Sequence, residues 1–370
     1  MTLGHFIVSQ FLYNLKPRKM KVLRYTLAAM LLGGAIVSCD TDIENNDIVT
    51  PTTYDAQYYE NLRDYKATDH QIAWGWFSDY TQMYSLATRF MGLPDSLDIC
   101  SLWGGIPGDD PNDTTTHYLP EVYKEMKFVQ QTKGTKLVVP TIIRIRSFSE
   151  YYNIWQDKDG VWSKDANGIF ANDPYREAEG ETSQKAAMRQ FAYHLLRPIF
   201  EQELDGIDMD YEPEGDPLSG GNLDYFVQFV GKFVGPMASP ENTYTYPDGF
   251  TIKGNPKMLL CIDYYNQTPS ANTNEYTNWY VNQTYGGNPG GLPFSGCPTN
   301  KVVYTENVGD NWKSPECGKL LTYARYNPAK GRKGGFGAFF MHRDYINTGY
   351  GYNNYANMRR GIQIQNPTVH

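Results

Sequence analysis

The stretch FEQELDGIDMDYEPEGD, residues 200–216, decides the fold. Between 206 and 212 its residues alternate in character with a period of two, which is typical of a β-strand. On such a strand the three acids Asp208, Asp210 and Glu212 share one face, and the apolar and aromatic residues between them share the other. Three acids on one face repel one another and cost stability. The pattern therefore indicates that the acids serve a function.

Apolar segments of similar length recur along the chain, each followed by a loop rich in Gly, Asp, Asn or aromatic residues. With the acidic stretch they predict eight strands, within 71–77, 96–105, 135–145, 204–212, 257–265, 279–287, 300–309 and 334–342. Helices are expected at 52–67, 119–132, 184–202, 222–235 and 315–326. Strands that alternate with helices favour a parallel (β/α)8 TIM barrel over an all-β fold. We expect residues 53–370 to form this single catalytic domain, with 145–183 as a long loop after the third strand.

The barrel gives the acidic strand a definite place. Active sites of such barrels lie at the C-terminal ends of the strands. Glu212 ends the fourth strand just before Pro213, and Asp210 and Asp208 lie progressively deeper on the same inward face. A cation-binding or solvated acidic strand end is the alternative. Calcium loops, however, need Gly and Asn at turn positions, whereas the residues between these acids fit a packed strand.

Aromatic residues are frequent in this chain. It has 370 residues, of which 30 are Tyr and seven are Trp. Together with much Gly and Asn, this composition is typical of a carbohydrate-binding surface, because flat rings stack on sugar faces. An ordinary aromatic-rich extracellular protein would show the same excess, so composition alone leaves both readings open.

The N-terminus has the pattern of an export signal. From Met20 it runs through Lys21 and Arg24 to an apolar stretch that is too short for a membrane span. It resembles a bacterial lipoprotein signal, with IVSC as the lipobox and Cys39 as the lipidated residue. Residues 1–38 would be removed, and Met20 is an alternative start. The acidic linker 39–52 resembles the export tag of Bacteroidetes surface lipoproteins, which predicts an outer-membrane location at the cell surface.

Charge limits the partners of the mature chain. Removal of residues 1–38 takes away five basic residues and no acid, so the net charge moves from −8 to −13. A chain this acidic is a poor partner for nucleic acid or anionic headgroups, so we expect contact with the membrane through the lipid anchor only. Cys100 and Cys261 are expected as buried thiols, whereas Cys297 and Cys317 are open to pairing. No Cys or His spacing indicates a metal site, and we expect no cofactor.

The acidic stretch also carries a family resemblance. Residues 205–212, DGIDMDYE, strongly resemble the Asp-Gly-x-Asp-x-Asp-x-Glu motif of glycoside hydrolase family 18. The eight-strand pattern extends this resemblance over roughly 70–345, although outside the motif it is a similarity of pattern only. The family contains chitinases, endo-β-N-acetylglucosaminidases and inactive lectin-like members.

The resemblance implies a role for each residue of the motif. Glu212 would be the general acid and then the base that activates water. Asp210 would orient the substrate's N-acetyl group and stabilise the oxazolinium ion, and Asp208 would hold or share a proton with it. Asp205 and Gly206 are expected to be structural. Retention of configuration follows from the resemblance; a strand spacing of about 7 Å by itself would also be compatible with inversion.

Other strand ends supply further candidates. The family's sixth strand carries a Tyr that holds the acetamido group, and Tyr285 stands there, with Gln283 on the same face; a merely polar strand end is the alternative. Four aromatic residues at strand ends are candidates for lining the sugar cleft, with core packing as the alternative for each: Trp74, Trp76, Trp103 and Tyr264.

Two departures from typical chitinases point to the substrate. The third strand, KLVVPTIIRI, lacks their Ser-x-Gly-Gly, and the last strand, GGFGAFFMH, lacks their Trp. Both favour the endo-β-N-acetylglucosaminidase branch, which cleaves the GlcNAc-β-1,4-GlcNAc chitobiose core of N-glycans. A chitinase-type hydrolase of other GlcNAc polymers and a non-catalytic glycan-binding protein are the alternatives. The expected partner is thus an N-glycan or another GlcNAc-containing oligosaccharide.

Replacement of Cys39 by Ala tests the lipoprotein interpretation. One acyl chain gives marginal membrane attachment and several make it stable, so the native protein should stay with outer membranes through salt washing. The Cys39→Ala protein should be soluble or unprocessed in cell fractionation. If it still sediments with washed membranes, the lipidation site is wrong.

Overall fold

The computed structural model describes residues 51–81, 85–146, 173–177, 179–290, 294–346 and 354–367. The expected signal and Cys39 lie outside the described residues, as do residues 39–50 of the linker and 147–172 of the long loop. Residues Thr50–His370 form one compact unit. In the described ranges, no helix has the length and apolar character needed to cross a membrane.

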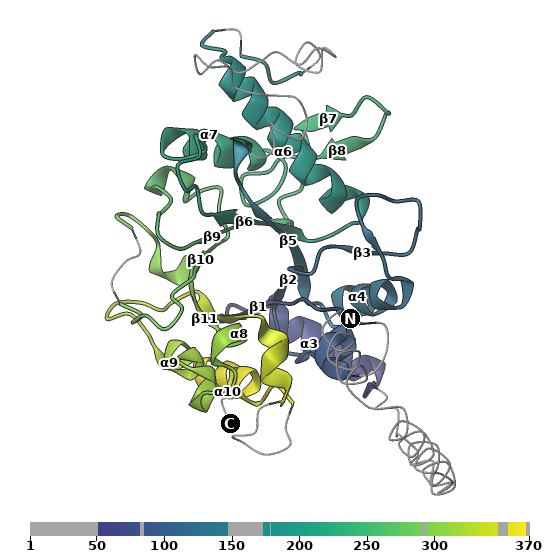
Figure 1. The fold of residues 1–370 in the computed structure, drawn as a ribbon, viewed down its shortest axis with the longest axis vertical. Helices are drawn as coiled ribbons and strands as arrows, with labels where there is room; N and C mark the ends of the chain where they lie inside the picture. Colours follow the sequence, from purple (N-terminus) through teal and green to yellow (C-terminus); the bar gives the residue numbers. More distant parts are fainter. Residues whose placement is uncertain are drawn as a thin grey trace, which may run out of the picture. The chain divides into compact units, whose positions relative to one another are not determined.

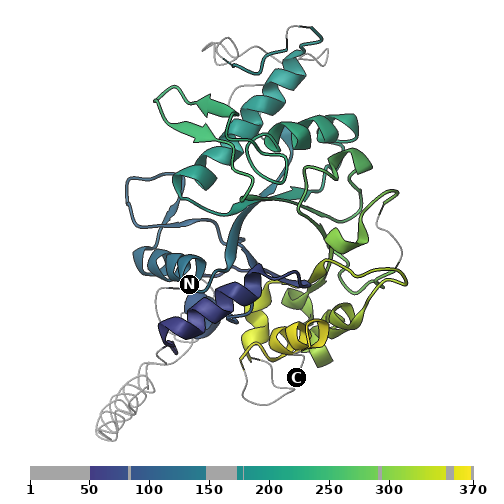
Figure 2. The ribbon, with the colours of Figure 1, turned by 180° about the vertical axis from the view of Figure 1, so that it is seen from behind.

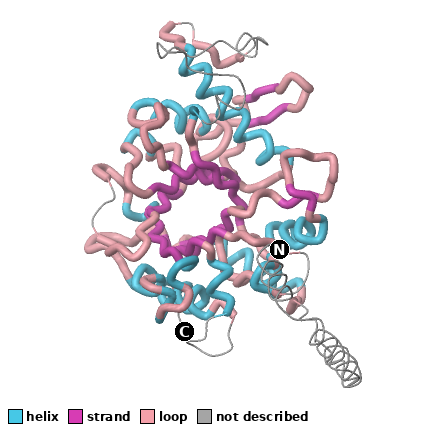
Figure 3. The backbone as a smooth tube through the Cα atoms, viewed as in Figure 1, coloured by secondary structure: helices cyan, strands magenta, loops and turns pink. Residues whose placement is uncertain are grey.

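Eight parallel strands close into a barrel, which confirms the predicted (β/α)8 architecture (Figures 1 and 3). Their order around the barrel is β1-β12-β11-β10-β9-β6-β5-β2. The strands are β1 (Ile72–Trp76), β2 (Ile99–Ser101), β5 (Lys136–Ile142), β6 (Gly206–Tyr211), β9 (Leu259–Tyr264), β10 (Trp279–Asn282), β11 (Val302–Asn307) and β12 (Gly335–Phe339). Each lies inside one of the eight segments expected from the sequence.

Helices and short turns surround the ring of strands in Figure 3. The α-helices are α3 (Ala56–Ala67), α4 (Pro120–Gln131), α6 (Ser183–Glu201), α7 (Gly221–Val230), α8 (Val308–Asn311), α9 (Leu320–Arg325) and α10 (Ala356–Gln365). The 3-10 turns are η1 (Leu86–Thr88), η2 (Phe90–Gly92), η4 (Ala271–Thr273), η5 (Thr299–Lys301), η6 (Pro315–Cys317) and η7 (Met341–Ile346). Two small ribbons complete the fold: β3 (Pro107–Gly108) with β4 (His117–Tyr118), and β7 (Thr243–Thr245) with β8 (Thr251–Lys253).

Two predicted helices differ from the observed ones. The helix expected over 222–235 ends at Val230, after which the chain turns to bury Phe233 in the core. The helix expected over 315–326 divides into η6 and α9, because the backbone adopts positive φ at Glu316 and Cys317, within η6, and at Gly318, which follows it. A continuous α-helix does not accommodate that conformation.

The strands are covered on both faces, as parallel sheets require. The residues of β6 that point outward, Ile207, Met209 and Tyr211, are buried against the helices. Inside the barrel an apolar plug includes Trp74, Val138 and Cys261. The inward acids of β6 therefore lie above a dry plug, inside a layer that excludes water.

The first strand and the last helix hold each other. Gln365 Nε2, near the end of α10, donates to Gln71 O at 2.8 Å and to Ile72 O at 3.0 Å, and the Gln71 amide donates to Asn366 Oδ1 at 3.1 Å. Helix α3, in the foreground of Figure 2, is joined to the same region by Asn366 Nδ2, which donates to the Tyr65 hydroxyl at 3.3 Å. The entry and exit of the barrel are thus fastened together.

The described cysteines are all buried. This confirms the expectation for Cys100 and Cys261, which lie on β2 and β9 and are fully enclosed. Cys297 and Cys317 form no disulfide with each other. The Cys317 thiol instead donates to Asp344 Oδ1 at 3.3 Å.

Candidate active site

The acids of β6 form a gradient of burial that leads up to the mouth of the barrel. Asp208 is fully buried, Asp210 is 3% exposed, and the side chain of Glu212, one residue beyond the strand, is 30% exposed. The period of two in the sequence produces this arrangement, because every second side chain points inward. The structure thus brings together the three acids that the sequence placed on one face.

Asp208 is fixed from below by two neutral donors. Its Oδ2 accepts hydrogen bonds from Trp76 Nε1 at 2.9 Å and from Ser101 Oγ at 2.8 Å. These residues end β1 and β2, on the far side of the barrel from β9. A buried carboxylate is tolerated only when such donors satisfy it.

A fourth acid, Asp263 on β9, completes the cluster. The register of the strands places it directly beside Asp210, and its side chain is fully buried. Gln283 Nε2 donates to Asp263 Oδ1 at 2.5 Å and more weakly to Asp210 Oδ1 at 3.3 Å. Gln283 therefore joins the acids from the side of β10.

The two deepest carboxyls, those of Asp208 and Asp263, share a proton. Within the described part of the chain, Asp208 Oδ1 and Asp263 Oδ2 are buried without a donor of their own. The two carboxyls lie within hydrogen-bonding reach of each other. One proton between them satisfies both oxygens. Burial, and then the charges of Asp208 and Asp210, raise the pKa of Asp263 well above its usual value, so Asp263 keeps this proton.

Asp210 is also biased towards its neutral form. Burial raises its pKa, and the nearby Glu212 and Asp208 carboxylates raise it further, whereas a hydrogen bond from Asp263 opposes the shift. Burial likewise raises the pKa of Asp208. The cluster titrates as a unit. A positive charge that develops near Asp210 can therefore be stabilised by a negative charge that Asp210 shares with the neighbouring carboxyls.

Glu212 is held at its backbone and stays open at its carboxylate. Arg144, just beyond β5, donates from Nε to Glu212 O at 2.7 Å. Its Nη2 lies 3.8 Å from Glu212 Oε2 and 3.0 Å from Glu214 Oε2, so the stronger ion pair is with Glu214. The Glu212 carboxylate therefore remains available at the mouth of the site.

Tyr285 also belongs to the site, although not as a strand residue. Strand β10 ends at Asn282, and Tyr285 follows in a turn with φ +32°, so the predicted strand to 287 was too long. Its amide donates to Thr305 O at 3.1 Å, and Glu306 accepts from the next amide, Gly286 N, at 3.3 Å. Burial and the neighbouring acids raise the pKa of the Tyr285 hydroxyl well above its usual value.

The acid cluster is not arranged as a metal site. In the described ranges, no group of three or more His, Cys, Asp or Glu side chains is placed to hold a metal ion. The observed partners of the acids are N–H and O–H donors and one another.

Comparison with known proteins identifies this arrangement. The family model described as glycoside hydrolase family 18, BT1044-like, matches residues 41–285, which include the whole acidic motif and Tyr285. The chain belongs to glycoside hydrolase family 18. It is therefore a glycosidase, and its similarity to known enzymes of this family is to those of the endo-β-N-acetylglucosaminidase type.

Three relatives support this placement. Endo-β-N-acetylglucosaminidase F2 of Elizabethkingia meningoseptica is 27% identical over 310 residues, which are 79% of each chain. A solved BT1044 variant is 21% identical with a TM-score of 0.56, covering 84% of this chain and 93% of that one. A solved endo-β-N-acetylglucosaminidase variant from Cordyceps militaris, in complex with fucosyl-N-acetylglucosamine-Asn, is 19% identical with a TM-score of 0.56, covering 86% and 98%. Both structures share the fold.

The first two residues of the family 18 motif lie at the base of β6. Asp205 Oδ2 accepts from Gln130 Nε2 at 2.8 Å and from the Leu137 amide at 3.0 Å. At Gly206 the backbone has φ +154°, and a Cβ would lie 2.1 Å from Leu259 O, so only glycine fits. Both positions set the register of β6 against its neighbours, at the end remote from Glu212.

The aromatic candidates have different positions from those expected. Tyr264 points out of the barrel and packs against Phe294 with ring centroids 6.5 Å apart, so the prediction that it lines the cleft is wrong. Trp74 is fully buried in the apolar plug, and Trp76 is 1% exposed and holds Asp208, so neither has a surface to offer a sugar. Trp103 is partly exposed at the mouth, with its ring against Phe339.

Sequence reasoning missed Asp263 and Ser101. A signal for Asp263 was present: in KMLLCIDYY it is the only charged residue after the initial Lys, and it lies two positions from Cys261 on the inward face. The alternation that identified the β6 acids would therefore also have placed Asp263 inside the barrel and Tyr264 outside. Ser101 carries no comparable signal, because its contact with Asp208 depends on how β2 and β6, the two neighbours of β5, are placed relative to each other.

Replacement of Asp263 by Asn tests the buried proton. Because the folded-state pKa of Asp263 is raised, the native protein binds a proton that the unfolded chain releases above its own pKa, and stability falls as pH rises. Through this group alone, the free energy of unfolding should fall by up to about 1.4 kcal/mol for each unit by which pH rises. Asn has the shape of the protonated Asp263 side chain and can still donate a hydrogen bond, but it does not titrate. In urea unfolding between pH 5 and 8, the stability of the Asp263→Asn protein relative to wild type should therefore increase with pH. A difference that stays constant over this range would contradict the proton assignment.

Proposed function

We propose that this protein cleaves the GlcNAc-β-1,4-GlcNAc bond in the chitobiose core of N-glycans, with retention of configuration and with the substrate's own acetamide as nucleophile. The observation that carries the proposal is the proton-sharing acid cluster directly below Glu212, next to Tyr285. Such a cluster suits a reaction in which a positive charge forms near Asp210 and the protein supplies no nucleophile. The endo-β-N-acetylglucosaminidase relatives favour the chitobiose core as substrate.

In the first step the acetamide oxygen attacks the anomeric carbon of the sugar on the glycan side. The bond to the leaving oxygen breaks, and Glu212 donates its proton to that oxygen. The oxazolinium ion that results carries positive charge next to Asp210, and the shared negative charge of Asp208 and Asp210 stabilises it. Tyr285 donates a hydrogen bond to the acetamide oxygen and keeps it aimed at the anomeric carbon.

In the second step water opens the oxazolinium ion. The Glu212 carboxylate, now deprotonated, takes a proton from the water as the water oxygen bonds to the anomeric carbon. Two displacements at one carbon restore its original configuration. Glu212 suits both roles because it is the only acid of the β6 series with an open carboxylate, 30% exposed at the mouth.

The walls of the site are consistent with an endoglycosidase. Strand β5 turns Val138, Pro140 and Ile142 towards the interior in place of the small residues of chitinases, and β12 ends in Phe339 where chitinases carry Trp. For the location we propose the outer membrane at the cell surface, through a lipid on Cys39. Support for that location comes from the N-terminal sequence alone.

The released product tests the reaction. Incubation with a high-mannose glycoprotein should release glycans that end in one GlcNAc and leave one GlcNAc on the protein, as measured by mass spectrometry. The Glu212→Gln protein should fold and bind glycan but turn over about 10² to 10⁴ times more slowly, because the amide delivers no proton. Release of the whole glycan with conversion of Asn to Asp would overturn the proposal.

Tyr285→Phe tests the assigned hydrogen bond. The ring remains, so the unfolding midpoint should stay near that of wild type, but one donor to a charge-developing oxygen is lost. We expect turnover to fall about 10² to 10³-fold. A chitobiose thiazoline, which mimics the oxazolinium ion, should also bind more weakly. Unchanged turnover together with unchanged thiazoline affinity would remove Tyr285 from the site.

A further inference from the structure

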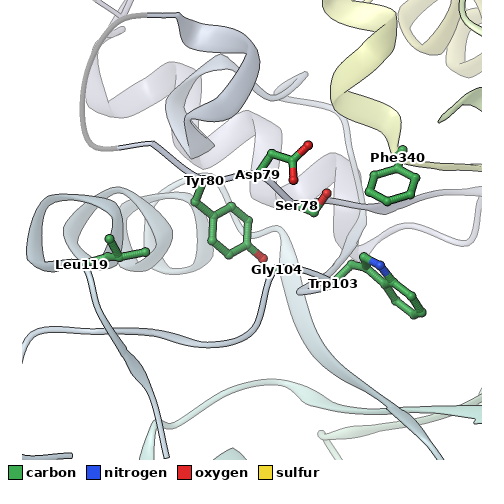
Figure 4. Close-up of a pocket in the computed structure, with 7 residues that line it drawn as sticks. All are labelled: Ser78, Asp79, Tyr80, Trp103, Gly104, Leu119 and Phe340. Carbon is green, nitrogen blue, oxygen red and sulfur yellow. The ribbon is translucent and has the colours of Figure 1, made fainter. Parts of the chain in front are cut away.

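A cavity of about 450 Å³ lies at the C-terminal ends of β1, β2 and β12 (Figure 4). None of its walls belongs to the acid cluster. Its lining residues follow these three strands, apart from one that precedes α4: Ser78, Asp79, Tyr80, Trp103, Gly104, Phe340 and Leu119. In Figure 4 the Asp79 carboxylate and the Ser78 hydroxyl lie between the Tyr80 ring and the rings of Trp103 and Phe340. The cavity thus combines aromatic surfaces with oxygen acceptors.

The polar groups of the cavity are prepared for a neutral, hydroxyl-rich ligand. Asp79 is 62% exposed at its side chain, and its Oδ2 is held 3.1 Å from His342 Nε2, which leaves Oδ1 to accept from a ligand. The Ser78 hydroxyl is buried and has no hydrogen-bond partner among the described residues. Asp79 is the only charged residue of the lining, so an anionic sugar would be repelled.

The backbone of the cavity is held in an unusual conformation. Asp79 has φ +58° and Phe340 has φ +49°, in the left-handed region that residues other than glycine seldom adopt. Such residues cluster at ligand sites, where the surrounding structure enforces them. Here the two lie on different strand ends and line the same cavity.

Aromatic rings connect the cavity to the acid cluster. The Trp103 ring lies against Phe339 with centroids 5.1 Å apart, and the Phe339 ring lies 6.0 Å from that of Tyr285. A ligand that extends from Tyr285 over these rings would reach Trp103 without crossing a gap in the aromatic surface.

The order of the strands determines which part of a substrate would enter the cavity. In the closed barrel β12 lies four strands from β6 in either direction, so the two are opposite. In a pyranose ring C4 lies opposite C1. When the bond at C1 lies beside Glu212 after β6, C4 faces β12 and the cavity. In an N-glycan, C4 of this sugar carries the mannose residues of the departing glycan.

We propose that this cavity is a subsite for a neutral hexose of the glycan released, a mannose residue on the non-reducing side of the cleaved bond. The Trp103 ring packs against the C–H face of the sugar, and Asp79 Oδ1 and Ser78 Oγ bond its hydroxyl groups. This assignment rests on the proposed function, because it takes its orientation from Glu212 as the acid.

Substrates of two lengths test the subsite. One is an Asn-linked oligomannose glycan, and the other is Asn-linked chitobiose without hexose. The Asp79→Ala protein should lose roughly 10- to 100-fold in kcat/KM on the long substrate, the loss expected for one bond to a charged group, and far less on the short one. Trp103→Ala should likewise lose activity on the long substrate and far less on the short one, because it removes the ring that packs against the sugar. Asp79→Asn should lose less than Asp79→Ala, because its amide oxygen still accepts. Asp64→Ala, which removes an exposed carboxylate on α3, is the matched control and should behave as wild type.

Binding gives a readout that does not depend on turnover. In the Glu212→Gln protein, calorimetry with the released oligomannose glycan should show affinity that Asp79→Ala reduces and Asp64→Ala does not. If the Asp79 and Trp103 variants bind the glycan as tightly as their parent, or lose activity equally on both substrates, the subsite is wrong while the proposed reaction stands. If they lose activity only on an intact glycoprotein, the cavity binds polypeptide, which also overturns the proposal. If wild type releases no glycan yet Asp79→Ala still weakens binding, the reaction is wrong and the sugar site stands.

Discussion

Three buried aspartic acids, with Asp263 in hydrogen-bonding reach of the other two, are the constraint on which the rest of this structure depends. Full ionisation of Asp208, Asp210 and Asp263 would place three negative charges in a water-excluded barrel. The chain avoids this by keeping protons in the cluster and by surrounding it with neutral donors from β1, β2 and β10. Those donors work only if the three strands stay in register with β6 and β9. The chemistry at the mouth is therefore coupled to the closure of the whole barrel.

The acids of β6 have different roles because they are buried to different depths. The deepest carboxyls are buried and have fixed hydrogen-bond partners. Glu212 meets solvent and must both give and take a proton in one catalytic cycle. A single alternating strand produces this difference, because each step of two residues moves a side chain towards the mouth. No separate loop is needed to place the acid relative to its supporting cluster.

The sequence predicts the parts of this design that depend on local order. Alternation from 206 to 212 gives the inward face of β6, and the recurrence of apolar segments gives the barrel. It does not give Trp76 its role, because an aromatic residue at a strand end looks the same whether it faces a sugar or donates to a buried acid. The sequence places Tyr285 in the site but predicts too long a strand before it, since a turn with positive φ at Tyr leaves no mark in the sequence. Contacts between strands that are not direct neighbours, such as that of Ser101 on β2 with Asp208 on β6, depend on the curvature of the sheet and appear only in three dimensions.

The bonds between Gln365, Asn366 and the start of β1 have a mechanical consequence. A pull on the chain at Pro51 reaches the barrel through α3 and then β1. At the start of β1 the backbone of Gln71 and Ile72 is hydrogen-bonded to side-chain amides at the end of the last helix. Strand β9, with Asp263, stands four strands from β1 in either direction. Tension applied at the N-terminal end therefore acts first on the bonds between the first strand and the last helix, before it reaches Trp76 at the other end of β1, which donates to Asp208.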